Sequence, residues 1–93
     1  MVTRKITYHG NFQSESISAI VDLARKSEVS GQIKTDTTKS VVLNLEGDPS
    51  FIKLLQHQIE RKLKADISSK DVENLPYQYY IGLTFLPWAE LGN

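Results

Sequence analysis

The sequence predicts an α+β domain in which two helices cover one face of an antiparallel sheet. Segments whose apolar residues occupy every second position alternate with segments whose apolar residues recur every three or four positions, in the order strand, helix, strand, strand, helix, strand. A short polar segment joins the two middle strands, which favours a hairpin. The 93 residues leave room for one domain, since typical domains have about 100 to 150.

The first strand is expected over residues 2–9. Val2, Ile6 and Tyr8 share one parity there, although Arg4 interrupts it, and this alternation is typical of a half-buried strand. Gly10 and the asparagine after it end the pattern.

A helix is expected from Glu15 to about Ser27. Its apolar residues follow the i, i+3, i+4, i+7 spacing of one helix face, and they are Ile17, Ile20, Val21 and Ala24. Ser14 or Ser16 is the expected N-cap, because a serine hydroxyl can accept a hydrogen bond from a free N–H group of the first turn.

The two middle strands are expected at Val29–Thr35 and Lys39–Leu45, paired as an antiparallel hairpin. The residues between them, 36–38, include no Gly or Asn. A loop of about four or five residues is therefore expected in place of a tight two-residue turn.

The second helix has the clearest local start, with Asp48 as N-cap and Pro49 in the first turn. A short strand is expected over residues 67–72, and a longer one over residues 77–86. The odd-numbered side chains of this last strand are expected to face the core. The domain is expected to span residues 1–93, with a core of about residues 3–86 and a C-terminal tail of residues 87–93.

The expected core combines the apolar faces of these strands and helices. It consists of Ile6, Tyr8, Ile17, Ile20, Val21, Ala24, Ile33, either Val41 or Val42, Leu43, Leu45, Ile52, Leu55, Ile59, Tyr79, Ile81 and Leu83.

Composition excludes several classes of function. Eleven basic and eleven acidic residues give a net charge of zero, so general nucleic-acid binding is not expected. There is no cysteine, and the two histidines are far apart in the sequence, so no metal site is expected. No apolar run approaches the roughly 20 residues of a membrane span, and we expect a cytoplasmic protein without membrane association.

The order of elements is that of the split βαβ, or ferredoxin-like, sandwich. Within it, one spacing resembles the acylphosphatases, small enzymes of this fold. Residues 29–35 stand where that family has Leu-x-Gly-Trp-Val-x-Asn, and residues 45–48, Leu-Glu-Gly-Asp, follow Gly31 at about the family's distance. Residues 8–13 are similar to the family's exit from its first strand, Gly-x-Val-Gln. The resemblance covers roughly residues 3–73.

The catalytic positions of that family are not matched. Ser16-Ile17 stand where the family has Phe-Arg, Thr35 stands at its asparagine, and Gln32 stands at its tryptophan. In the family the arginine binds the anionic group of an acyl phosphate and the asparagine orients the attacking water. Neither Ser nor Ile can supply a bidentate cation for phosphate. The resemblance therefore implies an acylphosphatase-like domain that has lost its hydrolase activity and binds a small anion or a protein. The alternative is a weak acylphosphatase that uses a displaced cation such as Lys34.

A second resemblance concerns the flavin-binding BLUF photoreceptors, which share the fold. Tyr8 and the Leu-Glu-Gly at residues 45–47 are similar to that family, whereas Leu43 stands at the position of its flavin-contacting glutamine. A BLUF-like sensor is thus a remote alternative, and no cofactor is expected.

Two sets of residues are candidates for binding. A helix N-terminus attracts anions, which makes the polar run before and inside the first helix either a capping segment or a residual anion site. The anion-binding candidates are Gln13, Ser14, Ser16, Lys34 and Thr35. Near the C-terminus, aromatic and apolar residues predict either an interface or an ordinary open sheet face. The interface candidates are Tyr80, Leu86 and Trp88, and a homodimer through the last strand is one such arrangement.

Overall fold

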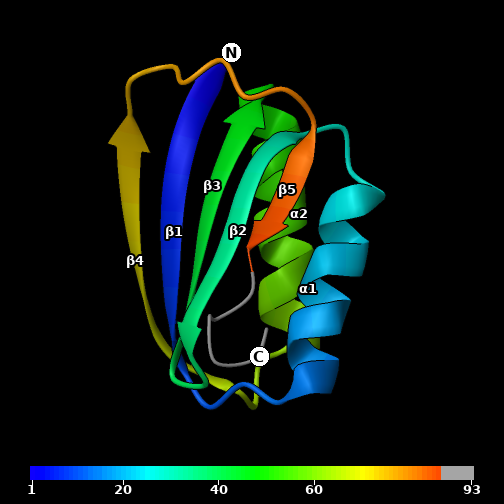
Figure 1. The fold of residues 1–93 in the computed structure, drawn as a ribbon, viewed down its shortest axis with the longest axis vertical. Helices are drawn as coiled ribbons and strands as arrows, with labels where there is room; N and C mark the ends of the chain where they lie inside the picture. Colours follow the sequence, from blue (N-terminus) through cyan, green and yellow to red (C-terminus); the bar gives the residue numbers. More distant parts are fainter. Residues whose placement is uncertain (87–93) are drawn as a thin grey trace.

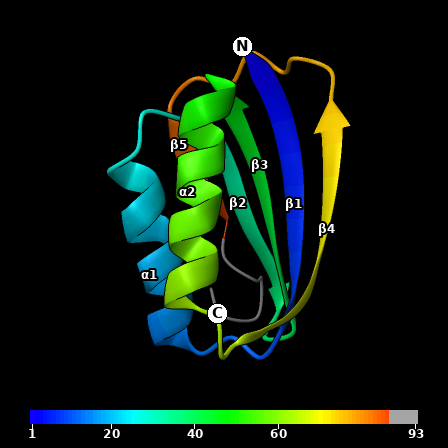
Figure 2. The ribbon, with the colours of Figure 1, turned by 180° about the vertical axis from the view of Figure 1, so that it is seen from behind.

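The computed structural model describes residues 1–86 of the chain. Its elements are β1 (Val2–Gly10), α1 (Ser14–Arg25), β2 (Ser30–Thr37), β3 (Ser40–Gly47), α2 (Pro49–Lys62), β4 (Ile67–Leu75) and β5 (Leu83–Leu86). Both helices lie on the same face of one sheet, and within residues 1–86 the opposite face carries no helix (Figures 1 and 2). The predicted fold class is confirmed. Neither helix is long and apolar enough to cross a membrane.

The sheet has five strands in the order β4-β1-β3-β2-β5. The first four pair antiparallel, whereas β5 pairs parallel to β2. The sheet is therefore mixed, and the expectation of a wholly antiparallel sheet is corrected at this edge. The cause is the route of the chain, which leaves β4 at one edge and passes across the end of the sheet where β1 begins before reaching the other edge (Figure 1).

Strand register places the core between the sheet and the helices. Ile6 lies opposite Leu43, which lies opposite Ile33, and all three are fully buried. Of the two adjacent valines, Val41 faces the helices and is fully buried, while Val42 is half-buried on the other face. The buried core consists of Ile6, Tyr8, Phe12, Ile20, Val21, Ala24, Ile33, Val41, Leu43, Leu45, Ile52, Leu55, Ile59 and Leu63.

Three differences from the expected core are informative. Ile17 and Leu83 are only partly buried, although both pack against the core. Phe12 is 2% exposed but was missed, because it is a single apolar residue in a polar loop and belongs to no periodic pattern.

The helix starts differ in how they are capped. The Asp48 side chain accepts a hydrogen bond from the backbone N–H of Ser50 at 2.8 Å, which confirms the predicted cap of α2. In α1 the N-cap is Gln13, with no side-chain cap. The expected caps, Ser14 and Ser16, both lie inside the helix, and the hydroxyl of Ser16 serves a different contact described below.

The β2–β3 hairpin is tighter than expected. Thr37 pairs with Ser40, which leaves a two-residue turn, and the register shifts between Thr35 and Thr37. The expected loop of four or five residues is wrong, and the tight turn occurs together with this irregularity in β2.

The expected long last strand is also wrong. Only residues 83–86 form β5, and residues 76–82 are a connection outside the strands. The side chains expected in the core are exposed instead, by 39% for Tyr77, 76% for Tyr79 and 97% for Ile81. Tyr79 has φ 59°, a left-handed conformation that interrupts any strand there. The predicted tail, residues 87–93, lies outside the described residues.

Candidate functional site

The loop between β1 and α1 occupies the position where the sequence predicts anion binding. Three successive backbone N–H groups there are already used within the protein. Gly10 donates to the carbonyl of Lys39 at 2.9 Å, Asn11 to that of Asp66 at 3.0 Å, and Phe12 to that of Thr38 at 2.8 Å. A phosphate-cradling loop needs N–H groups that point at the ligand. In this loop three successive donors point at carbonyl oxygens.

An acidic side chain also stands beside the first turn of α1. The hydroxyl of Ser16 is largely buried and donates to Oδ2 of Asp66 at 2.7 Å. Glu15 in the same turn adds a second carboxylate. The positive end of the helix dipole is therefore already faced by anions of the chain itself, and these repel an incoming phosphate.

The sequence-predicted anion residues are only partly brought together. Gln13, Ser14 and Ser16 are adjacent at the start of α1. Thr35 is 4% exposed and pairs with Val41, whose side chain faces the helices.

Lys34 is the anion candidate that lies elsewhere. It pairs with Val42 on the opposite face of the sheet, because successive side chains of a strand alternate between faces. Lys34 is thus separated by the sheet from the start of α1, and it lines a pocket on the face without helices.

A basic residue that sequence reasoning missed is Lys62, at the end of α2. It shares with Ser14 and Glu15 a cavity of about 450 Å³ between the two helices. Glu15 and Asp22 line the same cavity, as does Lys26, so its acidic and basic side chains balance. Only the antiparallel packing of the helices brings Lys62 near the start of α1, and no local pattern indicates it.

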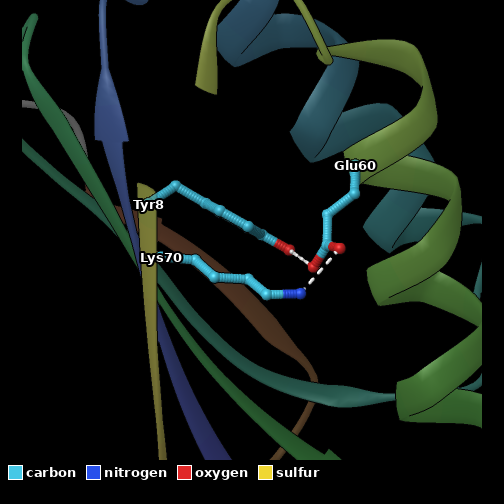
Figure 3. A network of polar contacts seen from close by, with 3 residues as sticks. All are labelled: Tyr8, Glu60 and Lys70. Carbon is cyan, nitrogen blue, oxygen red and sulfur yellow. Dashed lines mark hydrogen bonds and ion pairs between the residues drawn. The ribbon is translucent and has the colours of Figure 1, made fainter. Parts of the chain in front are cut away.

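A partly buried network joins the sheet to α2 (Figure 3). The hydroxyl of Tyr8 donates to Oε2 of Glu60 at 2.9 Å, and Nζ of Lys70 donates to Oε1 of the same carboxylate at 2.8 Å. Burial, followed by the hydrogen bond to Glu60 and its charge, raises the pKa of Tyr8. Burial alone would raise the pKa of Glu60, but hydrogen bonds from Lys70, Gln56 and Tyr8 outweigh it and lower that pKa. Tyr8 stays protonated and Glu60 ionised, so the network holds α2 against the sheet.

A buried carboxylate anchors the connection between β4 and β5. Glu46 is 1% exposed and accepts hydrogen bonds from the backbone N–H groups of Gln78 and Tyr80, both at 2.6 Å, and from the hydroxyl of Thr3. Burial by itself raises the pKa of Glu46, but these hydrogen bonds and one from the backbone of Tyr79 hold it below the ordinary value.

Two interface candidates, Tyr80 and Leu86, lie near Lys34 on the face of the sheet away from the helices, which we call the open face. Tyr80 is half-buried and lines the pocket that includes Lys34, and Leu86 pairs with Lys34 across the β2–β5 ladder. Leu86 is 40% exposed. Trp88 lies outside the described residues.

The two histidines line neither the cavity at the start of α1 nor the pocket that includes Lys34. His9 lies 3.0 Å from Asp71, and His57 is exposed. Within residues 1–86 no three His, Asp or Glu side chains are grouped so that they could hold a metal ion.

Comparison with solved structures identifies the fold. A crystal structure of acylphosphatase from Bacillus subtilis superposes with a TM-score of 0.79 over 92% of this chain and 99% of that one, at 13% sequence identity. The chain has the acylphosphatase fold. An acylphosphatase from Coxiella burnetii superposes with a TM-score of 0.67 over 90% of each chain, at 17% identity. Full-length HypF in a phosphate- and nucleotide-bound form gives 0.74 at 15% identity, over 95% of this chain and 12% of that one. No protein-family model and no curated sequence matches the chain.

The acylphosphatase fold explains one residue of the sequence resemblance directly. Gly31 has φ 141°, and a Cβ there would lie 1.8 Å from the carbonyl oxygen of Asn44 on β3. Only glycine fits this close approach of β2 and β3. The glycine of the resemblance is therefore a requirement of the fold and carries no information about catalysis.

Proposed function

We propose that this chain is a binding domain with the acylphosphatase fold that takes a small anion or a protein and does not hydrolyse acyl phosphates. The observation that carries the proposal is the contact of Asp66 with Ser16 at the start of α1. A carboxylate stands there in place of a cation, and stabilisation of the oxyanion is usually the largest single catalytic contribution.

The loop supports the same proposal. Its N–H groups at residues 10–12 donate to backbone carbonyls, so a phosphate would have to break existing hydrogen bonds to be held. The competing function is a weak acylphosphatase in which Lys34 replaces the missing arginine. The side chain of Lys34 is on the face of the sheet away from α1, which disfavours that mechanism. No observation favours flavin binding, since Leu43 is fully buried in the core and the Tyr8 hydroxyl is bonded to Glu60.

Hydrolysis of acetyl phosphate tests the proposal. We expect the wild-type protein and the Lys34→Ala variant to leave the spontaneous rate unchanged. Lys53→Ala, an exposed lysine of α2, is the matched control. Turnover that Lys34→Ala abolishes and Lys53→Ala preserves would establish the weak hydrolase instead.

A further inference from the structure

The open face of the sheet carries a pocket of about 320 Å³, which we call the open-face pocket. Four strands and the connection before β5 contribute its lining, which consists of Lys5, Gln32, Lys34, Val42, Asn44, Leu75 and Tyr80. Its volume is at the lower end of the range for small-molecule sites, so it suits a ligand of few atoms.

Strand register brings two lysines to the sides of this pocket. Lys5 on β1 lies opposite Asn44 on β3, and Asn44 lies opposite Gln32 on β2. Lys34 is two residues further along β2 on the same face. Lys5 and Lys34 are thus two strand spacings apart across the sheet and two residues apart along it, about 12 Å in all, and both side chains are long enough to reach a group above Asn44.

Neither lysine belongs to an ion pair within the described residues, although the carboxylates of Glu46 and Glu73 lie on the same face of the sheet. The ion pairs within residues 1–86 are His9 with Asp71 and Lys70 with Glu60, and neither includes Lys5 or Lys34. Glu73 lies opposite Lys5 on β4, but it is exposed and does not line the pocket. Because the chain has no net charge, anion binding here would depend on these local charges.

The floor of the pocket offers an unused hydrogen-bond acceptor. Oδ1 of Asn44 is buried and has no hydrogen-bond partner among the described residues. A buried polar atom without a partner is costly, and a ligand that donates an O–H or N–H group would remove that cost. The acceptor therefore selects among anions, because a plain carboxylate or phosphate dianion has no hydrogen to donate to it.

The wall formed by Tyr80 is held in place by Glu46. The backbone N–H of Tyr80 donates to Oε1 of Glu46 at 2.6 Å, and that of Gln78 donates to Oε2 at 2.6 Å. These contacts bring the connection over the end of the open face, so the tyrosine is positioned before any ligand arrives. Such preorganisation reduces the entropic cost of binding.

We propose that the open-face pocket binds a small organic dianion that also carries a hydroxyl or amino group. The two negative charges match Lys5 and Lys34, and the hydrogen-bond donor matches Oδ1 of Asn44. The inference rests on the proposed binding function and deepens it by naming a site and a ligand class. A dicarboxylate and a phosphate monoester share this chemistry, and the experiment distinguishes them.

Titration of ¹⁵N-labelled protein followed by NMR tests the proposal, with three probes. Malate is a dicarboxylate with a hydroxyl, succinate is the same dicarboxylate without it, and glycerol phosphate is a hydroxyl-bearing phosphate monoester. We expect saturable shifts of the amides of Gln32, Asn44 and Tyr80. Malate should bind about two- to tenfold more tightly than succinate, which corresponds to one net hydrogen bond.

Lysine variants provide the matched controls. Lys5→Met and Lys34→Met should each weaken binding about tenfold or more, since each removes a charged hydrogen bond, whereas Lys53→Met on α2 should leave it unchanged. Tighter binding of malate would support a dicarboxylate, and tighter binding of glycerol phosphate would support a phosphate monoester.

Four results would overturn the proposal: no saturable shift with malate or glycerol phosphate, shifts centred on the start of α1, equal affinities for malate and succinate, or an equal loss of affinity in Lys53→Met. Turnover of acetyl phosphate would overturn the proposed function. The titration would still decide separately whether the open-face pocket binds a dianion.

Discussion

Replacing Glu46 by alanine should release the connection between β4 and β5. The carboxylate accepts hydrogen bonds from Thr3, Gln78 and Tyr80, and each hydrogen bond to a charged group contributes about 1.5 to 3 kcal/mol. The two backbone N–H groups can regain water, because the neighbouring Tyr79 is 76% exposed. The Thr3 hydroxyl cannot regain water as readily, since Thr3 is 1% exposed. We therefore expect the free energy of unfolding to fall by about 2 to 4 kcal/mol, less than three full contributions.

Urea unfolding measures this loss, and hydrogen exchange locates it. Exchange should accelerate at the amides of Gln78 and Tyr80 more than in the helices. Glu28→Gln changes an exposed glutamate and is the matched control. A loss below about 1 kcal/mol for Glu46→Ala, or uniform acceleration of exchange, would refute the anchoring role.

Further predictions concern pH, the core, the Tyr8 network and association. The pKa of Glu46 is lower in the folded state than its ordinary value of 4.5, so ionised Glu46 stabilises the fold above pH 4.5. This stabilisation is lost as the pH falls through the pKa of the folded state. Glu46→Gln should therefore reduce the fall of the free energy of unfolding at acid pH, as measured by urea unfolding. Ile20→Ala and Leu55→Ala, both at fully buried sites, should each reduce the free energy of unfolding by about 2 to 5 kcal/mol, and losses below about 1 kcal/mol would contradict the packing. Tyr8→Phe should cost about 1.5 to 3 kcal/mol in urea unfolding by removing the hydrogen bond to Glu60, and an unchanged midpoint would contradict its role. β5 is an edge strand without a charged side chain to block pairing, so sedimentation should detect self-association that Tyr80→Lys weakens, and a strict monomer at all concentrations would exclude the homomeric interface.

Periodic patterns account for the parts of the fold that the sequence predicted. Ile20 and Ala24 belong to a helical stripe, and Ile6 and Tyr8 belong to a strand alternation. Each pattern reflects burial on one face of its element, so it can be seen within that segment alone. The start of α2 could also be predicted from neighbouring residues alone, because the Asp48 side chain caps it.

The last strand could not be predicted in this way. Residues 77–86 alternate like a strand, but a contact distant in the sequence decides their structure. Glu46 takes the backbone N–H groups of Gln78 and Tyr80, so these cannot join a sheet ladder. A glutamate 32 residues from its partner leaves no local trace in the sequence.

In the candidate site, too, contacts between sequence neighbours could be predicted, whereas contacts between distant residues could not. Gln13, Ser14 and Ser16 are neighbours in the chain, so the sequence placed them together at the start of α1. Lys34 was grouped with Thr35, although the alternation of side chains along a strand separates them onto opposite faces. The contact of Asp66 with Ser16 spans 50 residues and required the structure.

The rate of acetyl phosphate hydrolysis, measured side by side for the wild-type protein and Asp66→Ala, shows whether this domain is a hydrolase. The Asp66→Ala variant removes the carboxylate beside the start of α1 but supplies no cation and leaves the loop N–H groups bonded. For a binding domain without hydrolase activity, we expect both proteins to leave the spontaneous rate unchanged. Turnover by the wild-type protein would contradict the loss of activity, because the arrangement around Ser16 would then support hydrolysis without the arginine.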